Sequence, residues 1–168
     1  MKLPSNAHPD ITRVFEYYRA VSPPGALPST HQFDPMSSDI PEDIVDRMVL
    51  VEIKHEPWTF VTRYAGAYIE DFASEHLKGK EFAERLDNPY RTRVERNLIN
   101  VVRTAQPTWR RGQPMIRHET RNVTLERILL PLSHSGQTVD QLLFVTFHHE
   151  TQNPEQSERT TRLTVQHE

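Results

Sequence analysis

The chain has 168 residues, a mass of 19.7 kDa and a net charge of −3, and 36% of its residues are hydrophobic. A chain of this size typically folds as one domain. Because it contains no cysteine, disulfides, thiolate zinc sites, iron–sulfur clusters and cysteine nucleophiles are excluded.

The hydropathy pattern shows no membrane or secretion signal. No apolar run approaches the ~20 residues that a membrane-spanning helix needs, and the first ten residues lack the apolar centre of a signal peptide. We therefore expect a soluble, cytoplasmic protein with no membrane partner.

The first predicted helix covers residues 10–21. Pro9 suits the start of a helix, and apolar side chains recur after it at helical spacing: Ile11, Val14, Phe15, Tyr18 and Val21. Residues 22–28 contain three prolines and a glycine, which end the helix. A polar connector follows, in which residues 42–46 are long enough for one short helical turn.

A hairpin and a short helix come next. Residues 48–53 and 58–64 are rich in β-branched and aromatic side chains, and His55-Glu56-Pro57 forms the turn between them. After Ala65-Gly66 the period changes, because Tyr68, Phe72 and His76 recur on one side of a short helix that Gly79 ends. Phe82 and Leu86 then indicate a further turn or short helix.

The longest helix is predicted over residues 89–105, where Val94, Leu98, Val101 and Ala105 form one stripe. Three strands follow, at 108–115, 125–133 and 139–148. The last of them is apolar on both faces, which is typical of a strand in the centre of a sheet. If the later helices cover one face of that sheet, the N-terminal helix is the element available to cover the other.

This order of elements predicts an α+β domain, in which two runs of antiparallel strands flank a helical segment. We expect residues 1–38 to form the N-terminal helix and polar connector, and residues 39–149 the folded domain. Residues 150–168 are rich in Gln, Asn, Glu, Thr and Arg and are predicted to be a mobile tail.

Charge is distributed unevenly along the chain. Residues 34–87 carry 13 acidic and 6 basic side chains, whereas residues 91–127 carry 9 arginines and 3 acids. Two solvated faces of opposite sign account for this pattern, and so does an arginine-rich surface for an anionic partner. Nucleic acid is disfavoured, because the isoelectric point is about 6.3 and no helix is continuously basic.

The chain resembles the PAS domain family, in particular its stand-alone, single-domain bacterial members. Three groups of segments in a characteristic order carry the resemblance: Asp39-Ile40-Pro41 leading to Leu50-Val51-Glu52; Phe60-Val61-Thr62-Arg63-Tyr64-Ala65-Gly66 with Leu77-Lys78-Gly79-Lys80-Glu81-Phe82; and Glu126-Arg127-Ile128-Leu129-Leu130-Pro131-Leu132-Ser133 followed by Gly136 and Val139-Asp140-Gln141-Leu142-Leu143. The resemblance implies a five-stranded antiparallel sheet of order 2-1-5-4-3 with helices across one face. It also implies a sensory ligand-binding or protein-interaction role without a catalytic residue.

A ligand-binding site is expected between the sheet and its helices. We predict that it is lined by nine apolar and aromatic residues: Phe60, Tyr64, Tyr68, Phe72, Leu98, Val101, Trp109, Leu130 and Leu143. The alternative is that these side chains fill the core and leave no room for a ligand.

The N-terminal helix supplies the predicted partner surface. PAS domains often dimerise through such a helix, and its apolar stripe must be buried either on its own sheet or on a second subunit. We expect a homodimer with an interface made by Ile11, Val14, Phe15 and Tyr18. We also expect a signalling partner on another chain, because no output domain is attached.

Catalytic and metal motifs are missing from the sequence. There is no HExxH, GxxxxGK[ST] or GxSxG pattern, and Ser133-His134-Ser135 lacks an acid beside it in sequence. The nine histidines are scattered, and His148-His149, adjacent in a strand, must point to opposite faces. His76 on the short helix is the residue placed to ligate haem, but the sequence requires no cofactor. Asp39, Asp43 and Asp46 more often cap a helix than hold a cation.

We therefore predict a sensory or regulatory domain that binds a small molecule, a signalling protein or both. The alternatives are an interaction module with a filled core, in which the Arg91–Arg127 region docks a partner, and a small α+β enzyme. A His–Asp or His–Glu pair inside the pocket would favour the enzyme.

Overall fold

The computed structural model describes residues 1–34, 40–55, 57–82, 84, 86, 88–113 and 123–150. Its elements follow the predicted order: α1 (Pro9–Val21), α2 (Glu42–Val45), β1 (Met48–Lys54), β2 (Thr59–Ala65), α3 (Ala67–Ala73), α4 (Tyr90–Thr104), β3 (Thr108–Gly112), β4 (Val123–Leu132) and β5 (Gln141–Glu150). The five strands form one antiparallel sheet in the order β2-β1-β5-β4-β3. The predicted fold class, strand order and central position of the last strand are confirmed.

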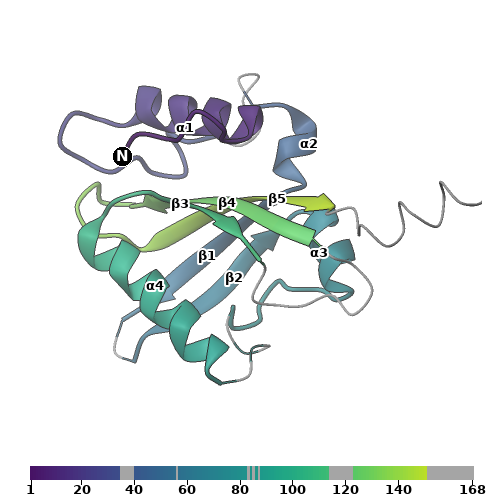
Figure 1. The fold of residues 1–168 in the computed structure, drawn as a ribbon. Helices are drawn as coiled ribbons and strands as arrows, with labels where there is room; N and C mark the ends of the chain where they lie inside the picture. The colour runs from purple at the N-terminus through teal and green to yellow at the C-terminus, as the bar shows by residue number, and fades with distance from the viewer. Residues whose placement is uncertain are drawn as a thin grey trace, which may run out of the picture.

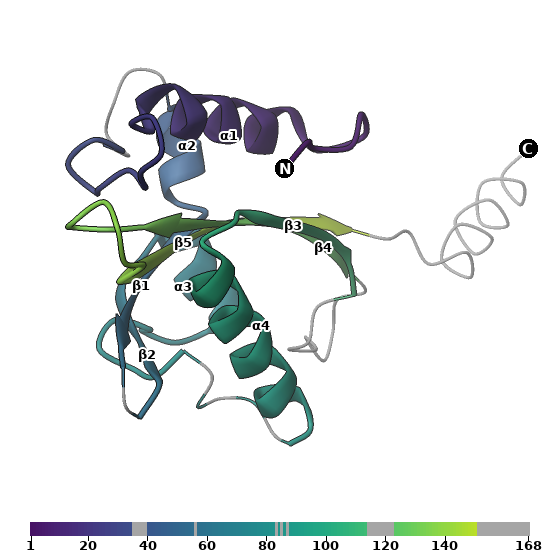
Figure 2. The ribbon, with the colours of Figure 1, turned by 90° about the vertical axis from the view of Figure 1, so that its left-hand side faces the viewer.

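Helices cover both faces of this sheet. In Figures 1 and 2, α1 lies along one face, and α3 and α4 lie against the other. The N-terminal helix therefore has the covering position predicted from the two apolar faces of β5. We call the two sides of the sheet the α1 face and the α4 face.

The α1 face is closed by apolar packing. Ile11 and Val14 have no exposed surface, and they share a cluster with alternate residues of β4 and β5: Ile128, Leu130, Leu132, Leu143, Val145 and Phe147. The Tyr18 hydroxyl donates a hydrogen bond to the carbonyl oxygen of Pro131 at 2.8 Å. Because this phenol is buried, its pKa is raised. The helix is thus fixed to its own sheet by both apolar and polar contacts.

The α4 face has a second core formed by the other side chains of the same strands. Val94, Leu98 and Val101 of α4 pack there with residues from four strands: Val49, Val51, Ile53, Phe60, Leu129, Leu142 and Phe144. In β5, Leu142 and Phe144 belong to this core, whereas Leu143 and Val145 belong to the α1 face. Successive side chains of this central strand point to opposite faces, and both faces are covered, so the strand is apolar at every position over this stretch.

The short helix α3 differs from its predicted extent. It ends at Ala73, because Ser74 adopts a left-handed conformation with φ of 55° as the C-cap. Gly79, predicted to end the helix, lies in the following loop, where its N–H donates to the Thr62 carbonyl at 2.8 Å. Consequently His76 is not on the helix. Phe82 lies in a turn, and the predicted tail at 151–168 lies outside the described residues.

Gly66 sets the start of α3 by a close backbone approach. Its N–H donates to the Met48 carbonyl at 2.9 Å. A Cβ at this position would lie 2.3 Å from the carbonyl oxygen of Asp46, well inside van der Waals contact. Only glycine fits there, so the chain turns directly from β2 into a helix beside the end of β5.

Candidate functional site

The nine predicted lining residues are divided by the sheet and do not surround one site. Phe60, Leu98 and Val101 belong to the core on the α4 face. Leu130 and Leu143 belong to the core on the α1 face, against which Trp109 packs. A sheet separates these two groups, so the expectation that they line one pocket is corrected.

The other three predicted lining residues lie near α3. The side chain of Tyr64 is 40% exposed, and its hydroxyl donates to the Val45 carbonyl at 3.3 Å. Tyr68 and Phe72 both contact His148 of β5. The predicted residues that meet on the α4 face are therefore Phe60, Leu98 and Val101 in its core, with Tyr68 and Phe72 at the end of β5.

The residues predicted for a dimer interface lie in the chain's own core. Ile11, Val14, Phe15 and Tyr18 are between 0% and 6% exposed, and all four pack with β4 and β5. A dimer that used these side chains would have to lift α1 off its sheet.

An aromatic and polar group lies under α3. The rings of Phe72 and His148 are stacked with their centroids 3.7 Å apart, and the Tyr68 hydroxyl lies 3.3 Å from Nδ1 of His148. The Arg47 guanidinium lies 3.9 Å from the centroid of the Tyr68 ring and 4.8 Å from that of Phe147. No residue of α3 is fully buried. The helix therefore rests on the sheet through ring and cation–π contacts, together with the partly buried Ile69, which packs against the core of the α4 face.

Arg127 adds a positive charge to the same face. In β4 it lies two residues from Leu129 of the α4-face core, and its guanidinium is 5.7 Å from the centroid of the Phe144 ring. Its neighbours across the strands are Arg110 of β3 and Thr146 of β5. Burial, together with the charge of Arg110, lowers the pKa of Arg127 to about 10. Within the described part of the chain, no carboxylate forms an ion pair with Arg127.

Glu126, the preceding residue, points to the α1 face and is fully buried. Its Oε1 accepts hydrogen bonds from the backbone N–H of His8 at 2.7 Å and from Nε1 of Trp109 at 3.0 Å. Its Oε2 lies 3.1 Å from Nε2 of His149 and 3.9 Å from Nη1 of Arg111. Burial acts to raise the pKa of Glu126, but these donors and the Arg111 charge outweigh it, so the pKa is lowered.

This network contains buried polar residues that the sequence analysis did not single out. His8 begins α1, where Nδ1 accepts from the N–H of Asp10 at 3.2 Å, and its ring stacks on Phe147 at 3.9 Å. His149 points to Glu126, whereas His148 points to Phe72, which confirms that these neighbours face opposite sides. An acid inside the apolar strand 125–133 was the one available signal. Nothing in the local sequence around His8 indicates its role.

The histidine predicted as a haem ligand lies at the surface. The side chain of His76 is 95% exposed, and its Nδ1 lies 2.9 Å from Oε2 of Glu70. The expectation that it stands on a helix beside the ligand site is therefore wrong, because α3 ends before it. Within the described ranges, no group of three or more His, Asp or Glu side chains is arranged to hold a metal ion, and Asp39 lies outside those ranges.

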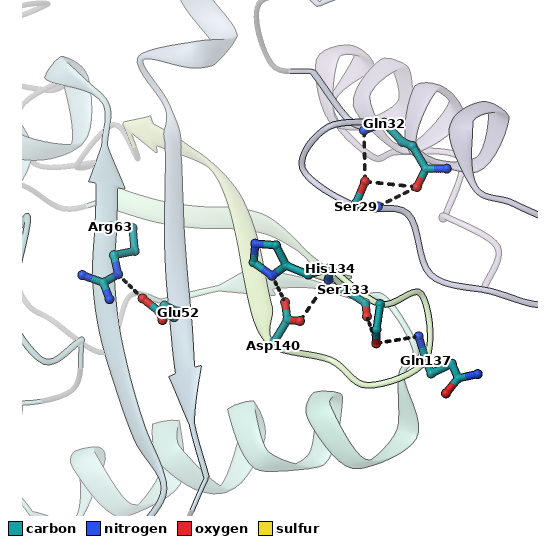
Figure 3. A network of polar contacts seen from close by, with 9 residues as sticks. Ser29, Gln32, Glu52, Arg63, Ser133, His134, Gln137 and Asp140 are labelled. Atoms are coloured by element: carbon teal, nitrogen blue, oxygen red, sulfur yellow. Dashed lines mark hydrogen bonds and ion pairs between the residues drawn. The ribbon is translucent and has the colours of Figure 1, made fainter.

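A His–Asp pair occurs in the turn between β4 and β5 (Figure 3). Nδ1 of His134 lies 2.9 Å from Oδ1 of Asp140, and the two side chains are 59% and 30% exposed. The hydroxyl oxygens of Ser133 and Ser135 lie 3.3 Å from each other. Across the described residues, no hydrogen bond joins either hydroxyl to the His134 ring. The contacts shown are those of a stabilised turn.

Comparison with protein families identifies the fold. A family model described as "PAS domain" matches residues 6–146, which include α1 and nearly all of the sheet. The chain belongs to the PAS domain family. PAS domains are generally sensory. Within the described residues of this PAS domain, no helix is long and apolar enough to cross a membrane.

The relatives of this PAS domain are distant. The comparison with curated proteins finds no match. Similar solved structures include the LOV protein of Rhodobacter sphaeroides, at 13% identity and a TM-score of 0.48 over 89% of this chain and 73% of that one. A substitution variant of RsLOV is similar at 13% identity and a TM-score of 0.48, over 87% of this chain and 74% of its own.

Proposed function

We propose that this PAS domain is a sensory module that binds a small molecule on the α4 face of its sheet, at the end covered by α3. The observation that carries the proposal is the contrast beneath that helix. The α4 core is apolar as far as Phe144, and beyond it β4 and β5 carry Arg127, Thr146 and His148 on the same face. α3, which has no fully buried residue, rests on His148 there. Convergent polar groups at the edge of an apolar layer are typical of small-molecule sites.

The construction of α3 supports a role in signalling. It has seven residues, fewer than an isolated helix needs for stability, so its conformation depends on its contacts with the sheet. Those contacts include Tyr68 and Phe72 on His148, Arg47 on Tyr68, and Ile69 on the core of the α4 face. A ligand that replaced any of them would shift α3, and the shifted surface would be recognised by a partner protein.

The second candidate function is a protein-interaction module without a ligand. It is favoured by the outer side of α4, where Arg93, Arg96 and Arg103 are exposed. These side chains form a positive surface for an acidic partner. Homodimerisation stays a prediction for either function, and size-exclusion chromatography with light scattering on the full chain measures it.

Native mass spectrometry of the freshly purified chain separates the two functions. We expect a population heavier than the polypeptide, whose extra mass is lost on denaturation and is therefore non-covalent. The matched controls are Tyr68→Ala, which removes a contact under α3, and Tyr90→Ala, which changes an exposed tyrosine. The ligand proposal predicts loss of the extra mass in the first variant and its retention in the second. Retention in both variants, or the bare polypeptide mass in the unmodified chain, would contradict it.

A further inference from the structure

We infer that Arg127, with Arg110 beside it, binds the anionic group of the ligand, a carboxylate or a phosphate. This inference rests on the proposed small-molecule site and specifies its ligand class. The geometry that supports it is a pair of arginines directly opposite each other on β3 and β4. Both partners of a cross-strand pair project from the same face of the sheet, here the α4 face.

The position of Arg127 is unfavourable without an anion. Like charges directly opposite on neighbouring strands repel each other, and partial burial weakens the screening of that repulsion by water. The depressed pKa of Arg127 has the same two causes, burial and Arg110. Within the described ranges, neither Arg127 nor Arg110 forms an ion pair with a carboxylate; Nη2 of Arg110 donates instead to the Gln113 carbonyl at 3.1 Å.

The same two strands show how the chain compensates a charge when it supplies the partner itself. One residue further along β3, Arg111 lies opposite Glu126 on the α1 face. Its Nη1 is 3.9 Å from the buried carboxylate, which also receives three hydrogen-bonding groups. The Arg110–Arg127 pair has the equivalent strand geometry but two bases. An anion from outside the chain would take the place that the Glu126 carboxylate has beside Arg111.

The surroundings of Arg127 indicate the rest of the ligand. Its guanidinium lies near the Phe144 ring, which is itself stacked on Phe82 with centroids 4.6 Å apart. A planar guanidinium forms paired hydrogen bonds with a carboxylate or phosphate, and the aromatic rings favour an apolar or aromatic body. We therefore expect a small molecule with one anionic end and an apolar remainder.

Two probes of matched shape test the charge requirement. Benzoate and benzamide have nearly the same size and ring, but only benzoate is charged. We would titrate each, and inorganic phosphate separately, into the 15N-labelled full chain and follow backbone and arginine Nε–H signals. The expected result is that benzoate binds at least about tenfold more tightly than benzamide, with shifts at Arg127 and Phe144. A larger response to phosphate would assign the anionic group as a phosphate, and a larger response to benzoate as a carboxylate.

The variants for this experiment separate charge, shape and general effects. Arg127→Met should abolish the preference for benzoate, and Arg127→Lys should retain part of it, because a lysine keeps the charge without the planar fork. Arg13→Met, at an exposed position of α1 on the other face of the sheet, should behave as the unmodified chain. A backbone NMR signal pattern like that of the unmodified chain confirms that a variant is folded. If Arg127→Met does not fold, Arg127→Lys is used to test the inference.

The outcomes distinguish this inference from the proposed function. Equal binding of benzoate and benzamide, or an unchanged preference in the folded Arg127 variants, would overturn the inference and leave the small-molecule site in place. No response to any of the three probes, together with the bare polypeptide mass in native mass spectrometry, would overturn both.

Discussion

Glu126 and Arg127 are neighbours in β4, yet they meet opposite conditions on the two faces of the sheet. Glu126 is fully buried on the α1 face and has four partners from three other parts of the chain: His8, Trp109, Arg111 and His149. Arg127 on the α4 face faces another arginine across the strands. On the α1 face, the chain itself supplies the partners of the buried charge. On the α4 face, the described residues supply no ion-pair partner for Arg127, so an anion from outside the chain can bind to it.

The largest expected effect follows from removing the carboxylate at the centre of the hydrogen-bond network on the α1 face. Glu126→Ala leaves the Trp109 and His8 donors without their acceptor in a buried position, and it removes the partner of Arg111 and His149. We expect a loss of about 3–5 kcal/mol in the free energy of unfolding, measured by urea denaturation. The matched control is Glu95→Ala, which removes a surface pair with Arg91 and should cost less than about 1 kcal/mol. Similar losses in both variants would contradict the account.

A pair of identical substitutions compares the two helices. Phe15→Ala in α1 removes a ring that is 6% exposed in the core and should cost about 3–5 kcal/mol of unfolding free energy. Phe72→Ala in α3 removes a partly exposed ring and should cost about 1–2 kcal/mol, since less apolar area leaves water there. Thermal and urea unfolding of both variants give the comparison. If the Phe72 variant lost as much as the Phe15 variant, α3 would be as firmly packed as α1.

The third prediction is that removing an arginine changes the stability in opposite directions on the two faces. Arg127→Met removes a charge whose lowered pKa marks a cost to the folded state that is fully present below pH about 10. The ligand-free variant should therefore be more stable than the unmodified chain by about 1–2 kcal/mol at pH 7. Arg111→Met, the corresponding change on the α1 face, should be destabilising. A loss of stability in the Arg127 variant equal to that in the Arg111 variant would remove the distinction between the faces.

The smallest predicted effect is a loss of unfolding free energy at acidic pH that depends on Glu126. Because the pKa of Glu126 is lowered in the folded chain, its contribution to stability is present above the unfolded pKa of about 4.3 and is lost as pH falls toward the lowered value. Unfolding free energies at pH 7 and at about pH 3 should differ more for the unmodified chain than for Glu126→Gln, by about 1 kcal/mol. An equal pH dependence of the two proteins would show that this carboxyl is not the titrating group.

Periodicity predicted most of the helices and strands, because each element carries a pattern that needs no knowledge of distant residues. The order of the strands in the sheet was predicted from the resemblance to the PAS family. The two apolar faces of β5 even predicted that α1 covers the second one. The lining of the α4 face was harder to predict, because neighbouring residues of a strand face opposite sides and both are apolar here. Leu130 and Leu143 were assigned to the site, whereas the structure places Leu129 and Leu142 on that face.

The polar groups could not be predicted for a different reason. The partners of Glu126 lie 17, 23 and 118 residues away in sequence at Trp109, His149 and His8, so only the register of three strands and the position of α1 bring them together. The same register places Arg110 opposite Arg127. The sequence showed an arginine-rich segment. Which of its arginines face solvent, the α1 face or the α4 face depends on how successive residues of each strand alternate between the two sides of the sheet.

The most direct test of the central claim is hydrogen exchange of the ligand-free chain with and without saturating benzoate, followed by mass spectrometry. The claim is that the two faces differ and that the α4 face under α3 receives an anionic molecule. We predict slower exchange in α3 and β4 when benzoate is bound and unchanged exchange in α1. Slowing confined to α1, or equal slowing in α1 and α3, would contradict the account.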